Sequence, residues 1–181
     1  MANLPQSQLR LSDLTTRQAT SFDLVPTADE RRAVADALGI NGIKKLKFSG
    51  QLAPVGKSDW TLTADLGATV VQDCVVTLAP VTTRIDEAVR RNYMANLPEV
   101  EATEIEMPED DTIEPLPATL DLAQVMIEAL ALALPLYPRA PDADLGEAVF
   151  TEPGTAPLTD DDAKPFAGLG ALRDRLENKD E

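Results

Sequence analysis

Apolar and polar side chains alternate with a period of two between residues 43 and 66, a pattern that predicts a β-hairpin. In its first strand Leu46, Phe48 and Leu52 alternate with lysine and polar residues, so one face is apolar and the other is basic and polar. The segment APVGKSD contains a proline and a glycine and predicts the turn. The returning strand repeats the alternation with Trp60, Leu62, Ala64 and Leu66.

Further strands are predicted on both sides of this hairpin. Residues 20–24 read as a short strand before it. After Gly67, a strand over about residues 69–78 has two fairly apolar faces, which indicates a central place in the sheet, and Pro80 ends it. A long strand over residues 81–93 follows, and a weaker alternation appears at residues 100–107. The pattern therefore predicts an antiparallel sheet of four to six strands, which could close into a barrel.

An early helix is bounded by clear start and stop signals. Thr27 and Glu30 have the spacing of a capping box, and Gly39 supplies the stop at the carboxyl end. Acidic residues in the first turn suit the positive end of the helix dipole. We expect a surface helix with one apolar side.

A second helix follows a connecting loop predicted at residues 108–119. Asp121 is the expected N-cap, with Gln124 as its capping-box partner, and Pro135 ends the helix. Its apolar positions recur at steps of three and four residues, which places on one face Leu122, Val125, Met126, Ala129, Leu130 and Ala133. This helix is expected to cover the apolar face of the sheet.

Residues 140–181 differ in composition from the rest of the chain. Residues 140–163 are rich in proline, aspartate, alanine and glycine, which favours an irregular, mobile segment. A short helix is predicted near the end from the helical spacing of Phe166, Leu169, Leu172 and Leu176. The expected organisation is one α+β domain over residues 1–139, with two or three helices on its sheet, and an acidic tail over residues 140–181.

The negative charge of the chain is confined to its second half. The 181 residues carry a net charge of -15; residues 1–100 contain 11 basic and 11 acidic side chains, whereas residues 101–181 contain 5 and 20. Such a half repels phosphate and suits a basic protein partner. Plain solubility explains the same charge and stays open as the alternative.

Few residues in the sequence are suited to catalysis. Histidine is absent, Cys74 is the single cysteine, and neither GxxxxGK[ST] nor GxGxxG occurs. We therefore expect no catalytic residues, no metal and no cofactor. The alternative is a small enzyme that works with the carboxylates of Asp86, Glu87 and Glu128. No stretch resembles a signal peptide or a membrane span, so a cytoplasmic protein without membrane contact is expected.

Two sets of residues have both a structural and a functional interpretation. Cys74 is expected in the core, as a small hydrophobe rather than an activated thiol. Glu128 could be a buried acid with a raised pKa, but we expect it to pair with a strand residue such as Arg84 or Arg90. A second set could contact RNA phosphates or a protein, or could simply form a solvated face: Arg31, Arg32, Lys44, Lys45 and Lys47.

Several motifs together resemble the YceD family, the large ribosomal RNA subunit accumulation proteins. They are the GxL strand at 50–52, CVVTLAPVTTRIDE at 74–87, LDLAQVMIEALALALPLYPRA at 120–140 and the terminal PFAGLGALRDRL. The resemblance spans about residues 15–176. It implies structural roles for the family-motif positions Cys74, Asp121, Glu128, Pro135, Tyr137 and Arg139.

The chain departs from this family at positions where many members carry further cysteines. Val76, Thr77 and Ala140 stand where those members have the CxRCL motif and a cysteine after YPR, so metal binding does not carry over. The resemblance implies a non-enzymatic ribosome biogenesis factor that supports accumulation or processing of large-subunit ribosomal RNA. Its partner would be the RNA precursor or a ribosomal protein, and an adaptor that delivers its C-terminal helix is the alternative. The sequence does not indicate an oligomeric state.

Overall fold

The computed structural model describes residues 4–96, 112–144 and 146. The chain divides into two units, Met1–Ala143 and Asp144–Glu181, and only two of the described residues belong to the second. The weak strand predicted at 100–107 and the helix predicted around 166–176 lie outside the described residues. The expected domain boundary at residue 139 also stays a prediction.

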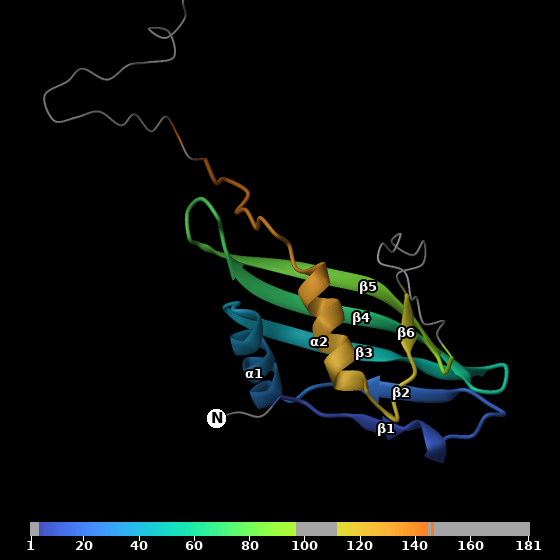
Figure 1. The fold of residues 1–181 in the computed structure, drawn as a ribbon. Helices are drawn as coiled ribbons and strands as arrows, with labels where there is room; N and C mark the ends of the chain where they lie inside the picture. Colours follow the sequence, from blue (N-terminus) through green and yellow to red (C-terminus); the bar gives the residue numbers. More distant parts are fainter. Residues whose placement is uncertain (1–3, 97–111, 145, 147–181) are drawn as a thin grey trace, which may run out of the picture. The chain divides into compact units, whose positions relative to one another are not determined.

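A five-stranded sheet with the order β2-β3-β4-β5-β6 forms the centre of the first unit (Figure 1). The first four strands are antiparallel neighbours, whereas β6 joins β5 in parallel. The α+β class is therefore confirmed, but the sheet is mixed and open, so a barrel and a purely antiparallel sheet were wrong. The strands are β2 (Thr20–Leu24), β3 (Gly42–Val55), β4 (Asp59–Asp73), β5 (Pro80–Met94) and β6 (Ile113–Pro115).

One long strand replaces two that the sequence predicted. β4 runs through Gly67 without interruption and keeps a constant register with β5 from Trp60 to Asp73. Gly67 serves packing rather than a turn: a Cβ there would lie 2.8 Å from the Arg84 Nη2 atom, which occupies that space. Cys74 is consequently the first residue after β4 and does not lie within a strand.

Both predicted helices in the described part of the chain are present. In α1 (Ala28–Leu38), Thr27 and Glu30 form both bonds of the capping box, and Gly39 ends the helix in the left-handed conformation with φ of 65°. In α2 (Leu122–Ala133), the Asp121 carboxylate accepts the Ala123 N–H at 3.0 Å. The reciprocal bond expected from Gln124 is not formed, and the helix ends before Pro135 as predicted.

Short pieces of structure at the start of the chain and before α2 were not predicted. β1 (Gln8–Arg10) pairs with β7 (Thr119–Asp121), and a single 3-10 turn (Leu11–Asp13) follows β1. The loop expected at residues 108–119 was therefore wrong in its described part, which contains β6 and the start of β7. Strands of three residues are too short to show a period, and their pairing partners lie far away in the sequence.

The two helices lie against one face of the five-stranded sheet. α1 contacts β3, and α2 crosses β4 and β5 (Figure 1). Between them and the sheet lies a continuous apolar core, whose fully buried large side chains include Phe48, Leu52, Leu62, Leu66, Tyr93, Leu122, Met126 and Leu130. The opposite face of the sheet, here called the outer face, is turned away from α2 and carries polar and charged side chains.

Candidate functional site

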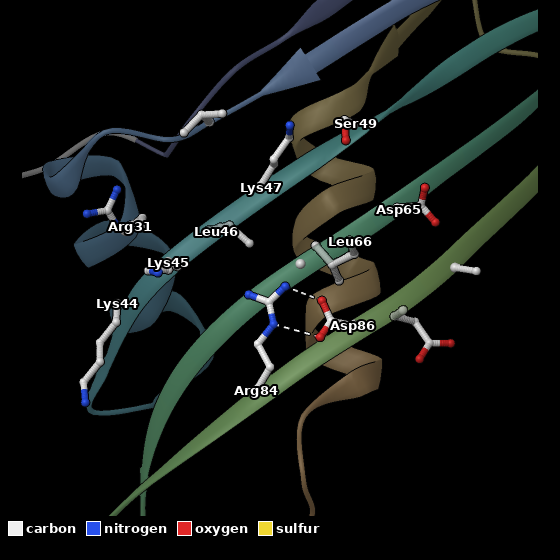
Figure 2. Close-up of a pocket in the computed structure, with 14 residues that line it drawn as sticks. Arg31, Lys44, Lys45, Leu46, Lys47, Ser49, Asp65, Leu66, Arg84 and Asp86 are labelled. Carbon is white, nitrogen blue, oxygen red and sulfur yellow. Dashed lines mark hydrogen bonds and ion pairs between the residues drawn. The ribbon is translucent and has the colours of Figure 1, made fainter.

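The outer face presents charged side chains in rows that cross the strands. Strand register places Lys45 on β3 beside Thr69 on β4, which in turn pairs with Arg84 on β5. Because side chains alternate between faces along each strand, these neighbours point to the same side. Figure 2 shows the charged groups in front of the strands, with α2 behind them.

A hollow of about 820 Å³ lies on this face between α1 and β5. Three carboxylate residues line it toward β4 and β5, namely Asp65, Asp86 and Glu87. Its cationic lining residues outnumber them and come from α1, β3 and β5: Arg31, Lys44, Lys45, Lys47 and Arg84. The structure therefore brings together four of the five basic residues that the sequence suggested.

An irregularity at the start of β3 places two lysines on the same side. The register with β4 shifts between Ile43 and Lys45, so Lys44 is the extra residue of a β-bulge. Ile43 and Leu46 are both buried, and the two lysines between them are both exposed. Without the bulge, strict alternation would send Lys44 and Lys45 to opposite faces.

The positive end of the hollow, defined as Arg31, Lys44 and Lys45, has no carboxylate partner within the described chain. Arg31 donates to the backbone oxygens of Pro26 and Ile43, at 2.7 and 3.3 Å. Lys44 donates to the Thr82 hydroxyl at 3.0 Å, and the Lys45 side chain forms neither a hydrogen bond nor an ion pair with any residue that the structure describes. Three cationic charges therefore remain available to an anionic ligand.

The other basic residues of the hollow are neutralised. Lys47 pairs with Asp23 at 3.2 Å. Arg84 lies over Gly67 and bonds Asp86 through two nitrogens, one of them at 2.8 Å, as the dashed lines in Figure 2 show. The hydrogen bonds from Arg84 hold the pKa of the Asp86 carboxyl below its usual value. This end of the hollow thus offers little net positive charge.

Sequence reasoning was incomplete at two of these positions. Arg32 is exposed, pairs with Asp29 at 2.9 Å and does not line the hollow, so its grouping with the lysines was wrong. Arg84 was not among the predicted contact residues. The alternation of residues 81–93 had already placed it on the polar face, but only the register with β4 places it over Gly67, with Thr69 between it and Lys45.

Cys74 is buried, as predicted, but it lies in the turn between β4 and β5 and has polar contacts, so the prediction of a plain small hydrophobe on a strand face was wrong. Its Sγ atom accepts backbone N–H groups from Val76, Thr77 and Ala140, each at 3.4 Å. Hydrogen bonds from Thr77 and from Ala140 lower the pKa of the Cys74 thiol from 9.0 to about 6. The residue therefore ties this turn to the segment that leaves α2.

Replacing Cys74 by alanine is expected to destabilise the protein in a pH-dependent way. The lowered pKa favours the folded thiolate, so this stabilisation is complete above the unfolded value of 9.0 and is lost as the pH falls through about 6. The difference in free energy of unfolding between wild type and Cys74→Ala should therefore grow as pH rises from 6 to 9. Urea denaturation at a series of pH values measures it, and a difference that does not change with pH would contradict the assigned hydrogen bonds.

The other family-motif positions divide into two groups. Asp121 caps α2, and the Pro135 oxygen accepts a bond from the Gln72 side chain at 3.2 Å, so both have structural contacts. Glu128, Tyr137 and Arg139 are exposed. Within the described residues Glu128 bonds neither Arg84 nor Arg90, so the predicted pairing was wrong. The Tyr137 side chain is 78% exposed, so it does not anchor the helix by burial.

The three carboxylates of the enzyme hypothesis do not form one constellation. Asp86 and Glu87 line the hollow, whereas Glu128 lies on α2 and lines none of the hollows described. Asp86 is bonded to Arg84, and its lowered pKa is opposite to the shift that a general acid needs at neutral pH.

The described part of the chain shows neither a cluster of metal ligands nor a membrane-spanning helix. Among the described residues no three side chains that could ligate a metal lie together. No described helix is long and apolar enough to cross a membrane.

Comparison with known proteins identifies the family. No curated protein and no solved structure matches the chain. A family model described as "Large ribosomal RNA subunit accumulation protein YceD" matches residues 62–173, which include β5 and α2 but not the positive end of the hollow. Since the match covers more than half of the sequence, the chain belongs to the YceD family, whose name links it to the accumulation of large-subunit ribosomal RNA.

Proposed function

We propose that this protein is a non-enzymatic ribosome biogenesis factor that binds phosphates of the large-subunit RNA precursor at the positive end of the hollow. The family supports the link to large-subunit RNA. The observation that carries the binding site is the cluster of Arg31, Lys44 and Lys45, whose charges no described carboxylate neutralises.

The contrast between this cluster and the rest of the chain supports the same site. The net charge of -15 lies in residues 101–181, which repel a polyanion, whereas residues 1–100 are balanced, so a local excess of positive charge there favours the approach of RNA to this site. Lysines and arginines that contact phosphates position RNA without reading its sequence. A factor of this kind would recognise the RNA backbone rather than a base sequence.

The chemistry of the hollow favours binding over catalysis. Asp86, the lining residue with a lowered pKa, is held ionised by Arg84 and accepts two hydrogen bonds from it. Lys44 and Lys45 lie on the exposed side of the bulge, where they can meet a ligand without first breaking an ion pair. These features suit electrostatic contact with an extended phosphate chain.

Replacing both Lys44 and Lys45 by alanine is expected to weaken binding to large-subunit precursor RNA. The association constant K decreases with salt concentration, and the slope of log K against log salt is negative. If each lysine neutralises about one phosphate, this slope should become less steep by about 1 to 2 in the variant. Fluorescence anisotropy with a labelled precursor fragment, titrated at several salt concentrations, measures both effects.

A matched control removes two other exposed basic residues, Arg17 and Lys57, which do not line the hollow. This double alanine variant has the same net charge as the first and should keep the wild-type slope. Equal losses in the two variants would show that general charge, not the positive end, governs binding. In cells depleted of the protein, the Lys44→Ala/Lys45→Ala variant should fail to restore the ratio of large to small ribosomal RNA.

A basic ribosomal protein is the second candidate partner. The 20 acidic and 5 basic side chains of residues 101–181 favour it, since they would attract a cationic segment. The same titration distinguishes the two partners: loss of Lys44 and Lys45 should weaken RNA binding and leave binding of a cationic protein unchanged. Delivery of a C-terminal helix to a partner concerns residues outside the described chain and stays a prediction.

A further inference from the structure

Most of β5 forms a free sheet edge. β6 pairs only with Asn92, Tyr93 and Met94, so within the described chain no strand lies beside residues 80–90 on that side. The Asn92 N–H donates to the Thr112 carbonyl at 2.8 Å, and the Met94 carbonyl accepts the Leu116 N–H at 3.0 Å, so both backbone groups face the segment that contains β6. Since backbone groups alternate in direction along a strand, the unpaired N–H and C=O groups of this edge belong to Thr82, Arg84, Asp86, Ala88 and Arg90.

This edge lacks two of the features that prevent pairing with another strand, a bulge and an internal proline. β5 has no bulge against β4, and its single proline stands at the first position. Eleven residues are long for an unprotected edge, and an edge of this kind is a template for a further strand. The partner that the edge accepts can be inferred from its side chains.

The free residues are complementary to a second copy of themselves. Ile85 is the midpoint of residues 80–90, and a twofold axis there would set two β5 strands antiparallel over the whole free length. Arg84 of each copy would then lie opposite Asp86 of the other, on the outer face. On the helix side, Val81 would lie opposite Val89 and Ile85 opposite itself.

Neighbouring registers lose this complementarity. An axis at Arg84 would set two arginines opposite each other, and an axis at Asp86 would do the same with two aspartates. Like charges directly opposite are destabilising in antiparallel pairs. The register centred on Ile85 therefore combines the greatest length with opposite charges.

Apolar surface next to the same edge supports a strand partner. A second hollow, of about 340 Å³, lies between β5 and α2 and is lined by Val89, Ala129 and Leu132, among others. Leu132 is 80% exposed, although it is a large apolar residue of the last turn of α2. Val81 of a second copy, opposite Val89, would cover part of this surface.

We propose that two copies of this chain associate through their β5 edges, with a twofold axis at Ile85 and reciprocal pairs between Arg84 and Asp86. The two five-stranded sheets become one continuous sheet, and both outer faces lie on the same side of it. This inference does not rest on the proposed RNA site, because it uses only the edge of β5 and the hollow beside α2.

The first test is the mass of the full chain in solution, measured by sedimentation equilibrium. A dimer is expected for the wild type. Ala88→Pro removes a backbone N–H that faces the free edge and pairs with no strand of the described chain, so the monomer should keep its melting temperature while the dimer weakens by about tenfold or more. A monomeric wild type at every concentration would overturn the proposal, whatever other partner the edge accepts.

A mixing experiment tests the register. Arg84→Glu and Asp86→Arg each place like charges opposite each other in a homodimer, and each should weaken it by about tenfold or more. An equal mixture of the two variants restores opposite charges across the axis, and heterodimers should form with near wild-type affinity. Both variants lose the pair within the chain, so rescue on mixing reports only the contact between copies.

The control for charge is Lys57→Glu in the turn between β3 and β4, which should dimerise like the wild type. If Arg84→Glu and Asp86→Arg each dimerised like the wild type, the β5 interface would be wrong. It would also be wrong if mixing the two variants did not restore dimers.

Discussion

Replacing Leu130 by alanine is expected to lower the free energy of unfolding by about 2–5 kcal/mol. Leu130 is completely buried on the face of α2 that meets the sheet, and it belongs to the same apolar core as Leu62 and Leu66. Truncation removes apolar contacts and leaves a cavity that the surrounding strands can fill only in part. Urea denaturation followed by circular dichroism measures the loss.

The same substitution at Leu136 serves as the control. Leu136 lies just beyond α2 and is 84% exposed, so Leu136→Ala should change the free energy of unfolding by no more than about 0.5 kcal/mol. If the two variants lost similar stability, burial of the α2 face would not be what stabilises the fold.

Gly50→Ala is expected to destabilise the protein by about 1–3 kcal/mol or more, although alanine usually stabilises a strand or helix relative to glycine. A Cβ at position 50 would lie 2.2 Å from the Thr63 carbonyl oxygen and 2.5 Å from the Ala64 Cα atom. These are backbone atoms of the neighbouring strand, so β3 and β4 would have to separate locally. Thermal and urea denaturation both report the change.

Gly42 is the matched position in the same strand. A Cβ there would meet nothing within 4 Å, and its backbone is not in the left-handed region. Gly42→Ala should therefore be neutral or slightly stabilising. A neutral Gly50→Ala variant would mean that β3 and β4 can part at this point without cost, contrary to their close approach.

Local signals in the sequence predicted the elements that depend on local physics. The capping box at Thr27, the left-handed stop at Gly39 and the cap at Asp121 all appear where the sequence placed them. Alternation also located the hairpin of β3 and β4 correctly. In each case the signal lies within a few residues of the feature that it specifies.

The errors arose where distant residues decide the structure. Gly67 was interpreted as a boundary, because glycine commonly marks one, yet its role depends on Arg84 in the next strand. The bulge that exposes both Lys44 and Lys45 depends on register with β4. Strands β1 and β7 are specified by each other, across more than a hundred residues, and neither has a pattern of its own.

The junction between β1 and α2 sets an order in which the chain can fold. The Asp121 carboxylate oxygen that caps α2 also accepts the Ser7 N–H, at 3.1 Å and 114 residues away in the sequence. Contacts of such separation cost loop-closure entropy, whereas β3, β4 and β5 are joined by short turns. During synthesis on the ribosome the three long strands are complete before residue 121 is added. During synthesis β1 therefore precedes its partner β7 by more than a hundred residues, and α2 can join the core only after the three long strands have been made.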